Sequence, residues 1–239
     1  MRTKYFKLIL IVINALVVIL GISALTRAFY IADDKILLFR FFTNDGNIFN
    51  IIVSIISIIY LSIHFNKKEE TPSWLFILNL LATSSEMLIL LVVLFVLMPQ
   101  GGLVVFRGYH LIVLHALNPI LTLIGFIFFN NQKISLWKTI LSVIPVLVYG
   151  IPVLLLCILK VIPTEIAPYS FFKVYVNPWY ETLLYMVGLV LGTCLISLGV
   201  YKLQEIIKLD RISNKALIIL FSIVLILLLS FLIFLIIIQ

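Results

Sequence analysis

Charged residues are scarce in this chain: Asp, Glu, Lys and Arg make up 11% of its 239 residues, whereas 64% are hydrophobic. A soluble domain carries about 25% charged residues. The scarcity excludes an ordinary water-soluble domain and makes the bilayer the expected solvent. The remaining basic residues form no patch interleaved with stacking aromatics, so we expect no nucleic-acid partner.

Cysteine is almost missing, and so are the motifs of cofactor chemistry. Cys157 and Cys194 both fall within hydrophobic runs, where they provide neither a disulfide framework nor a metal-ligand spacing. The sequence has no glycine-rich phosphate loop, CxxC pair or HExxH pair. We therefore expect no metal and no cofactor. It also lacks an internal repeat, the usual sign of an inverted-repeat transporter.

Long hydrophobic runs, in contrast, are abundant. A helix of about 20 apolar residues crosses about 30 Å of hydrocarbon. Seven runs reach this length, which predicts one all-α domain over 1–239, a transmembrane bundle with a six-span core and a seventh C-terminal span. The predicted spans are Phe6–Leu25, Phe42–Phe65, Trp74–Met98, Tyr109–Phe129, Trp137–Leu159, Trp179–Tyr201 and Ala216–Ile238.

The positions of Lys and Arg predict how these spans are oriented, because cytoplasmic loops carry an excess of basic residues. With the N-terminus inside, eleven basic residues fall on the cytoplasmic side and six on the other side. We therefore expect a multi-pass protein of the cell membrane whose N-terminus is cytoplasmic. Seven spans then place the C-terminus outside.

The second predicted span carries polar residues along one face. Their spacings of four, three, four and three residues place them on a single stripe of a helix. A helix in lipid has little reason to carry such a stripe unless it faces other helices or a polar cavity. The stripe consists of Thr43, Asn47, Asn50, Ser54 and Ser57.

Two further spans carry polar residues at membrane depth. Glu86 lies near the midplane of the third span, where an ionised carboxylate costs at least ~3 kcal/mol. It is expected to be protonated, paired or in contact with a wet cavity, either as an inter-helix contact or for ion coupling or catalysis. In the fourth span Pro119 is expected to kink the helix around His115. His115 itself is either a packed, hydrogen-bonded residue or a functional one.

The predicted topology brings Thr43 and His115 into the same half of the membrane. Both of their spans begin on the outer side, and His115 lies about 9 Å below the boundary. Thr43 lies nearer the boundary, and a tilt of either helix closes the difference in depth. A meeting of the two side chains is therefore a hypothesis for the structure to test.

Four patches in the sequence resemble the motifs of a bacterial family of six-span integral membrane proteins. Residues 39–47 (FRFFTNDGN) resemble its F-R-[FY]-F-T-x-x-S-N motif, and residues 115–121 (HALNPIL) resemble its H-x-x-x-P-[IL]-L motif. Pro145 and Tyr149 resemble its P-x-x-x-Y motif, and residues 168–174 (PYSFFKV) resemble P-Y-P-F-L-D-V. Their order and spacing agree over about 6–201, so the seventh span looks like an addition.

That family is similar to the eukaryotic androgen-induced and androgen-dependent membrane proteins, which hydrolyse fatty acid esters of hydroxy fatty acids with an intramembrane threonine and histidine. By motif position, the resemblance implies that Thr43 and His115 are the corresponding pair. It also implies that membrane lipids are both the surroundings and the substrate of the chain.

In the mechanism that this implies, His115 removes the proton of Thr43, which attacks a lipid ester and forms an acyl-threonine that water hydrolyses. Asn47, one turn from Thr43, is the candidate donor to the oxyanion. Asn118 is the candidate for holding a water or the imidazole. Hydrogen bonding between helices is the alternative for both asparagines.

The other candidate site residues are less tightly defined. Glu86 and Tyr149 are the candidates for orienting His115, as the acid does in a catalytic triad. Tyr169 and Phe171 are expected to cover the cavity or line its acyl entrance. The alternatives to a hydrolase are a transporter or channel with Glu86 as its ion site, a lipid-binding protein, and a purely structural bundle.

Overall fold

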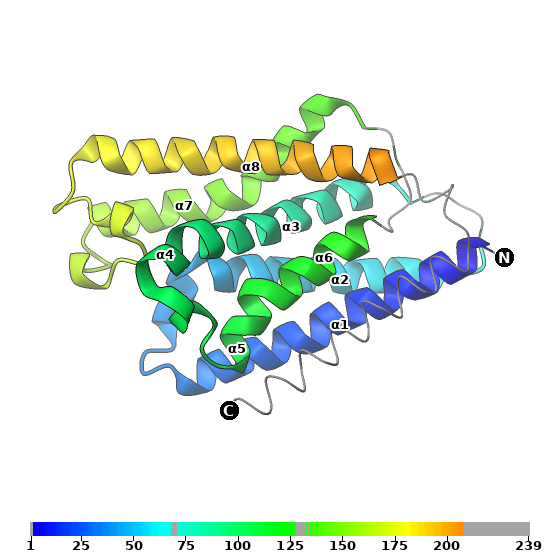
Figure 1. The fold of residues 1–239 in the computed structure, drawn as a ribbon, viewed down its shortest axis with the longest axis horizontal. Coiled ribbons are helices and arrows are strands. Elements are labelled where there is room, and N and C mark those ends of the chain that lie inside the picture. The colour runs from blue at the N-terminus through cyan, green and yellow to red at the C-terminus, as the bar shows by residue number, and fades with distance from the viewer. Residues whose placement is uncertain (1, 68–70, 128–131, 133, 208–239) are drawn as a thin grey trace.

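Six long helices dominate the computed structural model, which describes residues 2–67, 71–127, 132 and 134–207. Each is long and apolar enough to cross a membrane, and they lie side by side as a bundle (Figure 1). The prediction of an all-α polytopic membrane protein is confirmed. The seventh predicted span, Ala216–Ile238, lies outside the described residues. The six spans are Lys4–Ile31, Phe42–Ile63, Ser73–Phe106, Tyr109–Ile127, Leu136–Ile158 and Trp179–Ile207.

Three of these spans are continuous α-helices and three are interrupted. The continuous ones are α1 (Arg2–Ile31), α2 (Phe42–Ile63) and α8 (Trp179–Ile207). The third span consists of α3 (Ser73–Val92), the π-helical turn η2 (Val93–Leu97), α4 (Met98–Gly101) and the 3₁₀ turn η3 (Gly102–Phe106). The fourth consists of α5 (Tyr109–Ile112), the π-helical turn η4 (Val113–Leu117) and α6 (Asn118–Ile127). The fifth joins the 3₁₀ helix η5 (Leu136–Ser142) to α7 (Val143–Ile158).

The polar stripe of α2 is buried against α3 and α6. Asn50 Nδ2 donates to Thr122 Oγ1 of α6 at 2.7 Å, and Asn79 Nδ2 of α3 donates to Ser57 Oγ at 3.0 Å. Asn50, Ser54 and Ser57 are all buried. Since lipid cannot solvate such groups, the hydrogen bonds between helices satisfy Asn50 and Ser57. The inner part of the stripe therefore holds the bundle together.

α1 runs close along α2 and is tied to its far end. Lys7 Nζ donates to the carbonyl oxygens of His64 (2.7 Å) and Lys67 (2.8 Å), beyond the last turn of α2. At Gly21 an added Cβ would lie 2.8 Å from Ile51 Cδ1 of α2, so only glycine permits this approach. The two contacts fix the direction in which α2 points.

Irregular segments gather at the end of the bundle where α2 begins, as the positions of α4 and α5 illustrate (Figure 1). The chain reverses between the third and fourth spans at Gly102 (φ +65°) and Gly108 (φ +96°), a backbone conformation that glycine adopts readily. Three short 3₁₀ turns complete the connections: η1 (Ile36–Arg40), η6 (Thr164–Ile166) and η7 (Ser170–Phe172). The third span thus continues past its predicted end at Met98 through several irregular turns.

Candidate functional site

Thr43 is the second residue of α2, and the backbone before it is held in place from a distance. Phe41 is extended (φ −102°, ψ 125°), which ends η1 and starts α2 at Phe42. The Tyr149 hydroxyl of α7 donates to the carbonyl oxygen of Arg40 at 2.6 Å. The Tyr149 and Phe42 rings also pack at 5.2 Å between centroids. These contacts fix the first turn of α2 against α7.

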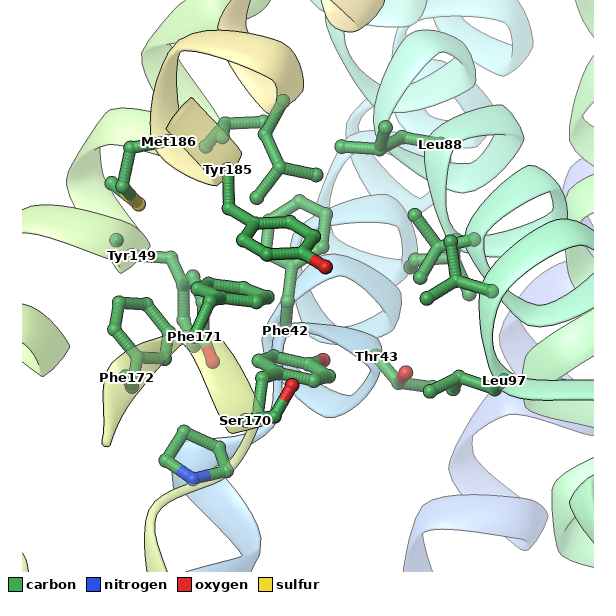
Figure 2. A pocket seen from close by; sticks show the side chains of 18 of the residues that line it. Phe42, Thr43, Leu88, Leu97, Tyr149, Ser170, Phe171, Phe172, Tyr185 and Met186 are labelled. Carbon is green, nitrogen blue, oxygen red and sulfur yellow. The ribbon is translucent and has the colours of Figure 1, made fainter. Parts of the chain in front are cut away.

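Thr43 lines an apolar cavity of about 240 Å³. Figure 2 shows the aromatic side chains of Phe171 and Phe172 on one side of this cavity and Leu88 and Leu97 on the other. Thr43 lies at one end, close to Leu97. The cavity takes its walls from α3, α7, α8 and the loop before α8, so it is suited to a hydrocarbon chain.

Thr43 also lines a second cavity, of about 410 Å³, which lies between the end of α1, η1 and the fourth span. His115 and His110 line this cavity together with Thr43. Tyr169 lines both cavities, as Thr43 does. Thr43 and Tyr169, together with Leu97 and Pro168, therefore lie where the two cavities adjoin.

His115 lies in the π-helical turn η4, four residues before Pro119. Proline has no N–H to donate to the carbonyl of the fourth preceding residue, and π turns are frequent at functional sites. The expected distortion around His115 is therefore present, as a π turn. His115 Nδ1 lies 2.7 Å from the carbonyl oxygen of Val105 in η3. Because a carbonyl only accepts, Nδ1 carries the proton and Nε2 is left with its lone pair.

Thr43 and His115 line one cavity but form no hydrogen bond with each other. Among the described residues, Val105 is the hydrogen-bond partner of the imidazole. Direct proton transfer requires a separation of roughly 3 Å or one bridging water. Proton transfer between the pair therefore requires a bridging water or a movement of the side chains.

Tyr169, expected to cover the cavity or line its acyl entrance, lies beside Thr43 and lines both cavities with it. Its hydroxyl lies near the Phe42 backbone and the Thr43 and Tyr149 side chains. Burial raises the pKa of Tyr169 to about 12, so the hydroxyl keeps its proton at neutral pH. Phe171, the other entrance candidate, stacks on the Tyr169 ring at 5.3 Å and lines the apolar cavity.

The side chains of Asn47 and Asn118 form hydrogen bonds that connect two helices. Asn47 Nδ2 donates to the carbonyl oxygens of Thr43 (2.8 Å) and Leu114 (3.2 Å), which uses both amide hydrogens. Asn118 Nδ2 donates to Asn47 Oδ1 at 2.8 Å. The inter-helix alternative therefore describes both residues. Neither holds the imidazole, and Asn47 has no hydrogen left for an oxyanion.

Neither candidate for orienting His115 reaches it. Glu86 is fully buried on α3, and its two oxygens have no hydrogen-bond partner of normal geometry among the described residues. Asn50 is the polar side chain beside it. Tyr149 is engaged with Arg40. The Val105 carbonyl orients the imidazole instead, and no side-chain motif signals a backbone oxygen of this kind.

No protein-family model matches the chain, and comparison with curated proteins and with solved structures gives no match. The fold defines the class: an all-α, multi-pass membrane protein in which Thr43 lines two adjoining cavities at the end of the bundle where α2 begins.

Proposed function

We propose that the chain is an intramembrane hydrolase of lipid esters, with fatty acid esters of hydroxy fatty acids as the substrate class that the sequence resemblance suggests. The observation that carries this proposal is the position of Thr43. Thr43 lies where an apolar cavity adjoins a cavity lined by His115. An ester that extends from one cavity into the other presents its carbonyl carbon to Thr43, with a hydrocarbon chain on either side.

The chemistry follows from the hydrogen bonds of the two residues. His115, with Nδ1–H held by Val105, has the tautomer of a general base, because Nε2 is free to accept a proton. A bridging water or a small closure of the cavity brings that proton from the Thr43 hydroxyl. Thr43 then attacks the ester carbonyl, the alkoxide leaves with the proton held by His115, and water hydrolyses the acyl-threonine.

Tyr169, in place of Asn47, is the proposed hydrogen-bond donor to the oxyanion. Its neutral hydroxyl lies at Thr43 and donates to the oxygen that becomes negative in the transition state. The free N–H groups at the start of α2 add a positive partial charge at the same place. The proposed active site therefore consists of Thr43, His115 and Tyr169, with Val105 as the orienting acceptor.

Labelling with a fluorophosphonate ester probe tests this proposal on the purified protein. We expect labelling of the wild type, none of Thr43→Ala, and a loss of at least tenfold in rate for His115→Ala, in line with the 10²–10⁴ that general bases contribute. Ser54→Ala is the matched control, since Ser54 lies on the same stripe but lines neither cavity. Labelling of Thr43→Ala at the wild-type rate excludes Thr43 as the nucleophile.

A cation-coupled transporter is the second candidate, and one observation favours it. Glu86 is a buried carboxyl group without a partner of normal geometry among the described residues, as at many intramembrane ion sites. Flux of an ion or proton into proteoliposomes that disappears in Glu86→Gln, together with no probe labelling of the wild type, identifies the transporter. Labelling at Thr43 without flux identifies the hydrolase.

A further inference from the structure

Arg40 lies three residues before Thr43 and next to Phe41, which lines a cavity with Thr43. Its guanidinium lies over the ring of Phe41, 4.9 Å from the ring centroid. Nε and Nη1 are buried, and neither has a hydrogen-bond partner among the described residues. The Phe41 ring lines the cavity of Thr43 and His115, and it meets the Tyr169 ring edge to face at 6.2 Å.

A buried guanidinium without an acceptor is costly, because its N–H groups have left water and gained nothing. The backbone at this position is fixed by the Tyr149 hydroxyl, which holds the Arg40 carbonyl. The guanidinium itself packs over the Phe41 ring. Its planar fork matches the oxygens of a carboxylate or phosphate, and a single anion can satisfy two N–H groups at once.

Arg40 is also close enough to Thr43 to act on the same molecule. The two residues are three apart, and three residues of extended chain span at most about 10 Å. The long side chain of arginine covers a comparable distance from its own backbone. An amphiphile with its chain in the cavity can therefore reach the guanidinium with its head group.

We propose that Arg40 binds the anionic head group, a carboxylate or a phosphate, of the single-chain amphiphile that occupies the Thr43 cavity. The proposal deepens the proposed function and rests on it for identifying that amphiphile as substrate or product. Arg40 is then the residue that selects charged esters over neutral ones, by positioning the ester at Thr43.

Ligand binding to the Thr43→Ala variant, which lacks the proposed nucleophile, tests this site without relying on catalysis. Thr43→Ala protein in nanodiscs of neutral phosphatidylcholine is loaded with radiolabelled oleate, and unlabelled oleate, lysophosphatidate and oleyl alcohol compete for it. We expect at least one anion to compete roughly tenfold better than the alcohol, since a charged hydrogen bond contributes about 1.5–3 kcal/mol. Preference for oleate alone identifies a carboxylate site, and preference for lysophosphatidate alone identifies a phosphate site.

Two substitutions in the Thr43→Ala background decide whether Arg40 causes that preference. Arg40→Gln is expected to abolish it, and Arg40→Lys to keep only part of it, because lysine has the charge without the fork. Arg107→Gln is the matched control: it removes another arginine near the same end of the bundle and is expected to keep the preference. Unchanged binding of oleyl alcohol, measured directly with a labelled sample, shows that each variant is folded.

The proposal is overturned if Arg40→Gln retains the preference, or if Arg107→Gln loses as much of it. It is equally overturned if neither anion competes better than the alcohol in the Thr43→Ala protein. An Arg40-dependent preference without any Thr43-dependent probe labelling leaves the anion site in place and refutes only the hydrolase.

Discussion

Removing the hydroxyl of Tyr169 separates catalysis from packing at the site. Tyr169→Phe keeps the ring, which stacks on Phe171 and meets Phe41 edge to face, and deletes only the group that lies near Thr43. If the hydroxyl merely fixes a rotamer of Thr43, the loss of one hydrogen bond costs about 0.5–1.5 kcal/mol, or roughly 2- to 13-fold in rate. If it donates to the oxyanion, the cost is about 10²–10³ in kcat.

We expect the larger effect, with kcat reduced about 100-fold and KM within about threefold of the wild type. The assay follows the release of fatty acid from a fluorogenic long-chain ester by the purified protein, with Thr43→Ala as the background. Tyr149→Phe is the control, because that hydroxyl donates to the Arg40 carbonyl. It is expected to lower thermal stability by about 1 kcal/mol while lowering kcat less than tenfold. A kcat of Tyr169→Phe within threefold of the wild type refutes the oxyanion role.

Three further predictions concern stability. Asn47→Ala loses two hydrogen bonds that join α2 to the fourth span, with Leu114 and Asn118, and one within α2, to Thr43. A loss of about 2 kcal/mol is therefore expected in detergent unfolding, against less than about 0.5 kcal/mol for Ser54→Ala. An equal loss in both would contradict the connector role. Glu86→Gln replaces a buried carboxyl group that has no partner of normal geometry among the described residues, and the free energy of unfolding is expected to stay within about 1 kcal/mol of the wild type or to exceed it; a larger loss would reveal an essential carboxyl group. Because burial raises the pKa of Tyr169 from 10 to about 12, the unfolded chain loses this proton first, and stability falls as pH rises from 10 towards 12. Tyr169→Phe should flatten that part of the curve, and a curve of unchanged slope would count against the burial of the hydroxyl.

The spans and the buried stripe were accessible from the sequence because they depend on local composition and period. Twenty apolar residues form a helix in lipid whatever their neighbours are, since every backbone group must be bonded within the segment. The stripe from Thr43 to Ser57 likewise has a helical period, and the structure buries its inner part between helices.

The details of the site were not accessible, because they come from segments without period. Val105 reaches His115 only because a π turn, a short α4 and two glycines with positive φ fold the end of the third span back. Tyr169 comes from a loop, and its hydroxyl was expected at an entrance rather than at Thr43. Asn47 and Asn118 were foreseen as polar groups facing inward, but which partners use their hydrogens depends on how two helices cross.

The position of Thr43 where two cavities adjoin has a consequence for steady-state inhibition. If the proposed hydrolysis takes place there, it leaves the acyl part and the alcohol part in different cavities, of about 240 and 410 Å³. Neither product then has to leave before the other. Either product, added alone, occupies one cavity and leaves the other open. The two products should therefore bind together rather than exclude each other. Their combined inhibition should exceed that of two ligands that compete for one site.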